Sequence, residues 1–291
     1  MIVIWRRFKH HRLGVIALFV LSILVLLALF ASILQSFLGV SHSEARLINI
    51  NMQPSWPHLL GTNELGQDIF TRLIYGGRIS LSVAFLAALS SALVGTFIGL
   101  VAGYYGGFID ALLMRFTDAM LCVPVLPLMI VFAALDLGAL AEGNLASVTK
   151  LIVIIVFFGW MSVARLARAS VLQLKNLEFV AAARSLGASD IRIMMSHILP
   201  NALAPIIIAA TLEVGTNILY EAALSFLGLG IQPPASSWGT MLNNAVDYVK
   251  TSPSLAFWPG FFILITVSCF NFLGDGMRDA LDPHQVLKNV K

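Results

Sequence analysis

Long apolar runs without charge constrain this chain more than any other feature of its sequence. No residue between Arg12 and His42 carries a formal charge, and the run Leu13–Leu38 is long enough to cross a bilayer core of about 30 Å at about 1.5 Å per helical residue. Of the 291 residues, 58% are apolar and only 11% are charged, which is far from the composition of a soluble globular protein. We therefore expect an all-α integral membrane protein.

Six apolar runs are expected to span the membrane. The second run contains Gly95, Gly99 and Gly103, and this spacing would let a neighbouring helix approach closely along one face. The third run contains Pro124 and Pro127, which predict a kinked or broken helix. The six expected spans are 13–38, 79–105, 119–135, 148–164, 202–226 and 255–273.

The positions of Lys and Arg predict which side of the membrane the chain ends face. Six spans place both termini on one side, together with the segment between the fourth and fifth spans. That side carries 13 of the 18 Lys and Arg residues, and the other side carries 5. Because cytoplasmic segments of membrane proteins are enriched in Lys and Arg, both termini and residues 178–200 are expected to be cytoplasmic.

Residues 178–200 form an alanine-rich, charged segment that ends in a proline. Four apolar side chains of its first half share one helical face: Phe179, Val180, Ala183 and Leu186. Gly187 is expected to end this helix, Ser189 to cap a second one, and Pro200 to end the second. The apolar side chains of the second helix also follow helical spacing: Ile191, Met194, Met195, Ile198 and Leu199. Two short amphipathic helices joined at a glycine would either lie on lipid head groups or dock on a cytoplasmic partner.

The spacing within this segment resembles the EAA loop of ABC importer permeases. That loop carries an alanine pair, a glycine and a terminal Leu-Pro, which here are Ala182-Ala183, Gly187 and Leu199-Pro200. In the peptide and nickel branch of the family the forms A-A-R-x-x-G-A-S and H-I-L-P-N are typical, and both occur here. Ala181 stands in place of the family's namesake glutamate, a position that often varies in this branch.

The resemblance extends over nearly the whole chain. Residues 61–72 look like the branch motif G-T-D-x-x-G-R-D-x-x-x-R, with Asn63 and Gln67 in place of the commoner Asp and Arg. Residues 221–239 and 274–283 match further motifs in the right order. The chain is similar to the C-type permease subunit of dipeptide and oligopeptide importers. This resemblance implies a type I ABC importer permease fold with six transmembrane helices.

The resemblance also implies an organisation and a set of partners. Residues 1–78 would form a transmembrane helix with an extracytoplasmic segment, 79–275 the permease domain and 276–291 a cytoplasmic tail. The partners would be a paralogous permease subunit forming a heterodimer, two cytoplasmic ABC ATPases and an extracytoplasmic substrate-binding protein that docks on the outer loops. The lipid bilayer would be a bacterial or archaeal cytoplasmic membrane. The residues expected to couple the permease to an ATPase are Ala182, Ala183, Arg184, Gly187, Ser189, Asp190, Leu199 and Pro200.

The sequence does not indicate a metal centre, a nucleotide site or a nucleic-acid partner. The six histidines are dispersed, without metal-ligand spacing to Asp, Glu or Cys. No G-x-x-x-x-G-K-[ST] motif is present, and a net charge of +3 is modest. We expect a non-catalytic subunit without a cofactor, whose partner subunits use ATP and Mg.

Two glutamates of the fifth expected span are candidates for the translocation path. At about 100° per residue, Glu213 and Glu221 are about 80° apart and share a broad helical face. They would either line the path and meet the amino end of a peptide, or bond to neighbouring helices. An intramembrane enzyme that uses these two residues and Asp136 is a second hypothesis, and a passive channel is a third.

The substrate class and the outer loop leave further expectations. A peptide is the expected cargo, while carriers of nickel or metal chelates, glutathione or oligosaccharides in the same family resemble this subunit equally. In the outer loop between the last two spans and just beyond it, Trp238, Tyr248 and Trp258 suit an interfacial aromatic belt.

Overall fold

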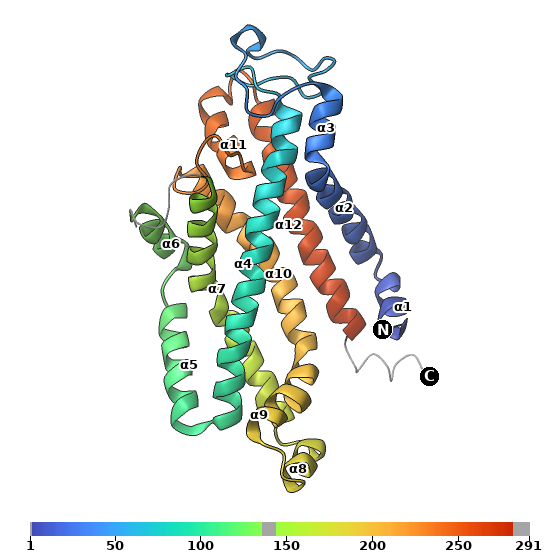
Figure 1. The fold of residues 1–291 in the computed structure, drawn as a ribbon, viewed down its shortest axis with the longest axis vertical. Coiled ribbons are helices and arrows are strands. Elements are labelled where there is room, and N and C mark those ends of the chain that lie inside the picture. Colours follow the sequence, from blue (N-terminus) through green and yellow to red (C-terminus); the bar gives the residue numbers. More distant parts are fainter. Residues whose placement is uncertain (1, 136–143, 282–291) are drawn as a thin grey trace.

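The computed structural model describes residues 2–135 and 144–281, and in these residues the fold is helical (Figure 1). The helices are α1 (Ile2–His10), α2 (Arg12–Leu29), α3 (Ala31–Leu38), α4 (Ile69–Tyr105), α5 (Gly107–Leu121), α6 (Val125–Ala134), α7 (Asn144–Leu174), α8 (Glu178–Ser185), α9 (Asp190–Arg192), α10 (Leu199–Phe226), α11 (Trp238–Ala245) and α12 (Ser254–Leu281). Short 3-10 turns at Leu47–Asn49 and Val246–Tyr248 and a π-helix at Ile193–Ile198 complete them. The predicted all-α class is confirmed.

Five described helices are long and apolar enough to cross a membrane, and a bent pair makes a sixth if it is counted as one span. The five are α2, α4, α7, the helical run Asp190–Phe226 and α12. The sixth consists of α5 and α6, which are bent by 83° at the break that Pro124 predicts. The predicted bounds 119–135 are wrong, because the helix already begins at Gly107. The charged residues of α5 are typical of a loop when only the sequence is considered. In the structure they lie in a helix, where Asp110 is neutralised by Arg168 of α7.

Three further helices extend well beyond their predicted spans, and α7 covers Asn144–Leu174 where 148–164 is predicted. Helix α4 begins at Ile69, where Asp68 caps it by accepting the N–H of Thr71 at 2.7 Å. Helix α12 continues to Leu281, so the first residues of the predicted tail are helical. Residues 282–291 of that tail lie outside the described residues. An apolar run locates a membrane span, but a helix continues until a cap or a breaker ends it.

The three predicted glycines bring α4 against α7. A Cβ atom on Gly95 would lie 2.5 Å from the carbonyl oxygen of Trp160, and one on Gly103 would lie 2.8 Å from Cβ of Val171. A Cβ on Gly99 would likewise overlap α7. Only glycine permits this close approach, which confirms the expected packing face.

The helices form an elongated bundle with different structures at its two ends (Figure 1). Helix α8 lies at one end, which we call the α8 end, and α1 lies toward it. The connection 39–68 and helix α11 lie at the opposite end, which we call the α11 end. Between the ends, α4 packs on α7 and α10, and α12 packs on α10 and α2. Helices α4 and α10 are therefore central and reach from one end to the other.

Candidate functional site

The segment 178–200 begins as the sequence predicts. Helix α8 ends before Gly187, whose φ of +80° lies in the left-handed region that favours glycine. The side chain of Ser189 then accepts the N–H of Arg192 at 3.4 Å and caps a second helix. The two-helix arrangement with one glycine joint is confirmed.

The predicted end of the second helix at Pro200 is wrong. The helix passes through the π-helix Ile193–Ile198 and continues as α10 to Phe226. In the π-helix the N–H of Leu199 donates to the carbonyl of Met194, five residues back. This wider turn accommodates Pro200, which has no N–H to donate, in the first turn of α10. The segment is thus directly continuous with a helix that crosses the bundle.

The predicted apolar faces are only partly buried. The buried side chains are Val180, Ala183, Ile193, Met194 and Ile198, and they pack against Leu100, Tyr104 and Val171 of α4 and α7. The exposed ones are Phe179, Leu186, Ile191 and Met195, and Leu186 is 88% exposed. The π-helix changes the angular position of each following residue, so a regular helical spacing assigns the second face wrongly.

Polar contacts fasten this segment to the end of α4. The hydroxyl of Tyr104 donates to Asp190 Oδ1 at 2.6 Å, and Arg184 Nη2 donates to the same hydroxyl at 3.4 Å. The bond to Tyr104 raises the pKa of the Arg184 guanidinium, which stays charged. Close by, Lys175 Nζ donates to the carbonyl of Gly103 at 2.8 Å. One tyrosine therefore joins both sides of the glycine joint to a central helix.

Ionic contacts brace the neighbouring helices. Arg168 of α7 donates from Nε and Nη2 to the two carboxylate oxygens of Asp110 at 2.5 and 2.6 Å, which is the bidentate geometry of a strong pair. Helix α5 is thereby held against α7 beside the segment.

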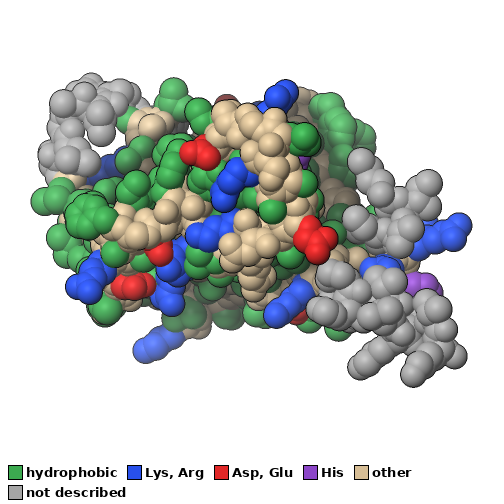
Figure 2. Space-filling view, turned by 90° about the horizontal axis from the view of Figure 1, so that it is seen from below, with side chains coloured by type: hydrophobic (Ala, Val, Ile, Leu, Met, Phe, Trp, Pro, Cys, Tyr) green, Lys and Arg blue, Asp and Glu red, His purple; other side chains and the backbone are tan. Residues whose placement is uncertain are grey.

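The surface of the α8 end combines apolar side chains with scattered charges (Figure 2). Its exposed apolar residues are Leu177, Phe179, Leu186 and Ile191, and Figure 2 shows Lys and Arg spread over this end with fewer acidic side chains between them. Of the predicted coupling residues, Ala183 is buried and Leu199 is half-buried. The others, Ala182, Arg184, Gly187, Ser189, Asp190 and Pro200, are exposed. A fastened, exposed apolar tip is a surface that fits a groove on another protein.

We expect Tyr104→Phe to loosen this segment without unfolding the bundle. The change removes a hydroxyl that bonds to Asp190 and Arg184, and such bonds contribute about 1–2 kcal/mol, so local opening should become about 5–30 times more frequent. Amide hydrogen exchange of residues 178–192 measures this. Tyr105→Phe is the matched control, because the Tyr105 hydroxyl has no hydrogen bond to a described residue. Equal exchange in both variants would contradict the assigned role of Tyr104.

The structure separates the two glutamates that the sequence places on one face. Glu221 is 0% exposed and accepts hydrogen bonds from Ser80 Oγ at 2.8 Å and Ser225 Oγ at 2.7 Å. Glu213 lies near Ser91, which is 11 residues, or about 16 Å, further along α4 than Ser80. Glu221 therefore bonds to neighbouring side chains, the structural alternative, and forms no joint site with Glu213. Asp136, named in the enzyme hypothesis, lies outside the described residues.

Ser80 connects Glu221 to α11 by hydrogen bonds. The sequence analysis did not identify Ser80 or Ser225 as part of this network. Ser80 Oγ also accepts the N–H of Trp238 at 3.2 Å, and the indole Nε1 of Trp238 donates to the carbonyl of Leu73 at 3.0 Å. Trp238 is 1% exposed, so its predicted place in an interfacial belt is wrong. A hydroxyl inside a long apolar run, as at Ser80, is the sequence signal that could have found these serines.

The α11 end explains two departures from the family motif. Asn63 Nδ2 donates to Gln67 Oε1 at 3.1 Å, and both side chains are buried. This neutral pair occupies the positions where the family more often has Asp and Arg, so one polar pair replaces another. Nearby, burial and then the charge of Arg72 lower the pKa of His42, whose imidazole is therefore neutral at pH 7.

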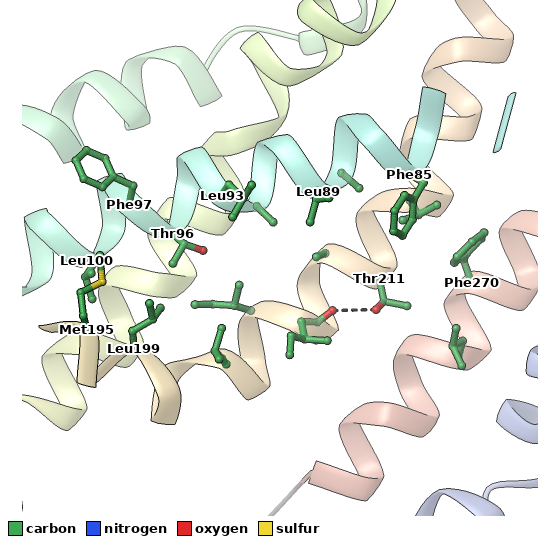
Figure 3. A pocket seen from close by; sticks show the side chains of 18 residues that line it. Phe85, Leu89, Leu93, Thr96, Phe97, Leu100, Met195, Leu199, Thr211 and Phe270 are labelled. Atoms are coloured by element: carbon green, nitrogen blue, oxygen red, sulfur yellow. Dashed lines mark hydrogen bonds between the residues drawn. The ribbon is translucent and has the colours of Figure 1, made fainter. Parts of the chain in front are cut away.

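An apolar groove of about 580 Å³ runs between α4, α10 and α12 (Figure 3). Its walls include Phe85, Leu93, Phe97, Met195 and Phe270, and no ionisable side chain lines it. Neither Glu213 nor Glu221 belongs to it. The groove suits a lipid chain or an apolar helix better than a charged solute.

The described residues contain no group of three or more His, Cys, Asp and Glu side chains that could hold a metal ion.

Comparisons with known proteins agree with this architecture. Residues 95–286 match the model of the family "Binding-protein-dependent transport system inner membrane component", and residues 2–49 match the "N-terminal TM domain of oligopeptide transport permease C". A solved methionine ABC transporter, in an inward-facing conformation, contains a chain with the same fold. The TM-score is 0.56 at 19% identity, over 72% of this chain and 97% of that one.

Several curated relatives match almost the full length. A dipeptide transport system permease protein of Alkalihalophilus pseudofirmus is 42% identical over 96% of this chain and 88% of its own. An oligopeptide transport system permease protein of Bacillus subtilis is 38% identical over 95% and 87%. A glutathione transport system permease protein of Pectobacterium atrosepticum is 39% identical over 96% and 89%. With its five or six candidate spans, its 178–200 segment and these matches, the chain belongs to the family of binding-protein-dependent transport system inner membrane components, the permease subunits of ABC importers.

Proposed function

We propose that this permease subunit carries peptides across the membrane, as one half of a heterodimeric path formed with a paralogous permease. The names of its relatives support the peptide class, since they cover dipeptide, oligopeptide and glutathione transport at 38–42% identity. All three substrates are built from amino acids joined by amide bonds. The lining of the described apolar groove supports a path shared with a second permease, because that groove offers a charged peptide no ionisable side chain.

The observation that carries the coupling role is the fastened, exposed tip of the 178–200 segment. Leu186 and Ile191 project on either side of Gly187, while Tyr104 ties the segment to α4. The second helix of the segment continues into α10. A partner that pushes on this tip would therefore move α4 and α10 together, and these helices reach the α11 end.

This role gives each end of the bundle a partner. The α8 end would face the cytoplasm, where one of two ABC ATPases binds the segment and uses ATP and Mg. The α11 end would face outward and receive the substrate-binding protein. The excess of Lys and Arg on the side that carries the termini supports this orientation in a bacterial or archaeal cytoplasmic membrane. The subunit itself would not be an enzyme.

Reconstitution tests the proposal. Proteoliposomes that contain this chain, its paralogous permease, both ATPases and the binding protein should accumulate the dipeptide Ala-Ala only when ATP is present. Vesicles that contain this chain alone should not. Accumulation of nickel or an oligosaccharide in place of peptide would overturn the peptide class. Uphill peptide transport by this chain alone would overturn the permease-subunit mechanism.

A further inference from the structure

Two polar atoms at the centre of the bundle lack a hydrogen-bond partner. Among the described residues, Ser91 Oγ and Glu213 Oε2 are the only buried side-chain nitrogen or oxygen atoms in this state. Ser91 on α4 is 0% exposed, and Glu213 on α10 is partly buried. Buried polar atoms are almost always bonded in folded proteins, so two unbonded atoms at one place need an explanation.

Gly159 of α7 forms the third side of this place. A Cβ atom there would lie 2.6 Å from Ser91 Oγ and 2.8 Å from Glu213 Oε1. The side chains of Ser91 and Glu213 thus both lie against the α-carbon of Gly159, and a side chain at position 159 would displace them. Gly159 and Glu213 lie at the midpoints of α7 and α10, and Ser91 lies near that of α4. The site is therefore deep in the spanning part of the bundle.

The three basic side chains of α7 have partners other than Glu213. Arg165 of α7 is six residues, or about 9 Å, from Gly159 and pairs with Asp118 at 3.6 Å. Arg168 pairs with Asp110, and Lys150 donates to the carbonyls of Ala133 and Leu135. Helix α10 contains no Lys or Arg. A carboxylate at membrane depth without a cation is costly, and such residues mark substrate or ion pathways.

The donor pattern of the missing partner follows from these acceptors. The two carboxylate oxygens of Glu213 accept hydrogen bonds, and the hydroxyl of Ser91 can accept one as well as donate one. A primary ammonium has three N–H donors and a positive charge. Bonds between such a group and a carboxylate are charge-assisted and short.

We propose that Glu213, Ser91 and the space over Gly159 bind the α-ammonium group of the transported peptide during its passage. This rests on the peptide function proposed above. Dipeptides, oligopeptides and glutathione share a free α-amino group, whereas their side chains and carboxyl ends differ in spacing. A site that binds this shared α-amino group would accept peptides of many different sequences. In the present arrangement the site is closed, so α7 moves away from α4 and α10 when the peptide passes between the two permeases.

Cysteine modification tests the site while Glu213 is retained. Ser91→Cys is placed in a background with Cys122→Ser and Cys269→Ser, which removes both native cysteines. The complex with the second permease and the ATPases is treated during ATP hydrolysis, without binding protein, with a cationic reagent (2-aminoethyl methanethiosulfonate) or an anionic one (2-sulfonatoethyl methanethiosulfonate). We expect the cationic reagent to be favoured, and Glu213→Gln to lower that preference about tenfold or more.

Peptide protection and a control position complete the test. Ala-Ala should slow the modification, whereas N-acetyl-Ala-Ala, which has no ammonium, should not. Thr96→Cys, on α4 in the apolar groove of Figure 3, should show no preference that depends on Glu213. A Ser91→Cys that no reagent reaches, or a preference unchanged by Glu213→Gln, would overturn the ammonium site. Because Ala-Ala uptake is measured separately with native Ser91, failure of the peptide function remains distinguishable.

Discussion

Replacing Gly187 by Trp should lower ATP-driven uptake about tenfold or more while the protein still inserts and assembles with its paralogous permease. The left-handed conformation at φ +80° costs a side-chain-bearing L-residue about 1–2 kcal/mol, which shifts the joint between the two helices of the segment. A Cβ atom at this position would meet nothing within 4 Å, so the bundle itself is not disturbed. The indole would instead enlarge the tip beside Leu186 and block a groove that receives it.

Two further variants separate the causes of this effect. Gly39→Trp has the same backbone strain, with φ +67° and nothing within 4 Å, but lies at the end of α3, far from α8. It should retain the ATPases during purification and keep substrate-stimulated ATP hydrolysis. Gly187→Asn tolerates the left-handed region and should keep most of the uptake. Normal coupling in Gly187→Trp, or an equal loss in Gly39→Trp, would count against the segment as the ATPase contact.

Features fixed by one backbone position could be predicted from the sequence. Gly187 must adopt a positive φ, Ser189 carries the cap, and the glycines of α4 leave room for α7 whatever the rest of the chain does. The break at Pro124 belongs to the same class. Each depends on local sterics or hydrogen bonding, and the structure has each where the residues indicate it.

Features that depend on distant partners could not be predicted in this way. The π-helix Ile193–Ile198 departs from regular helical spacing, and within it Ile193 is buried while Met195 is exposed. Trp238 is buried because α11 packs against α4. The spacing of apolar residues along the sequence does not indicate this contact. For the same reason Glu213 and Glu221 read alike in the sequence. Only the structure shows that Glu221 has bonded serines around it and Glu213 has an unbonded one.

That contrast gives the largest stability effect that we expect. Glu221→Ala removes the acceptor of two buried serine hydroxyls, from Ser80 and Ser225, and leaves a cavity where α4, α10 and α11 meet. Each buried donor left unbonded costs about 1–3 kcal/mol, so a loss of at least about 2 kcal/mol is expected. For a chain of this size that corresponds to a Tm about 4–8 °C lower. Tryptophan fluorescence during heating of the detergent-solubilised protein measures it, since Trp238 lies on the same network.

The matched comparison uses the other carboxyl of the same helix. Glu213→Gln removes no hydrogen bond that the described structure contains, so the Tm should change by less than about 2 °C. Glu221→Gln keeps one oxygen acceptor and should fall between the two. The order Glu221→Ala, Glu221→Gln, Glu213→Gln in decreasing loss follows directly from which oxygens are bonded. If Glu213→Gln destabilised the protein as much as Glu221→Ala, then Glu213 would be a structural residue, and its availability to a passing ammonium group would be contradicted by the same measurement.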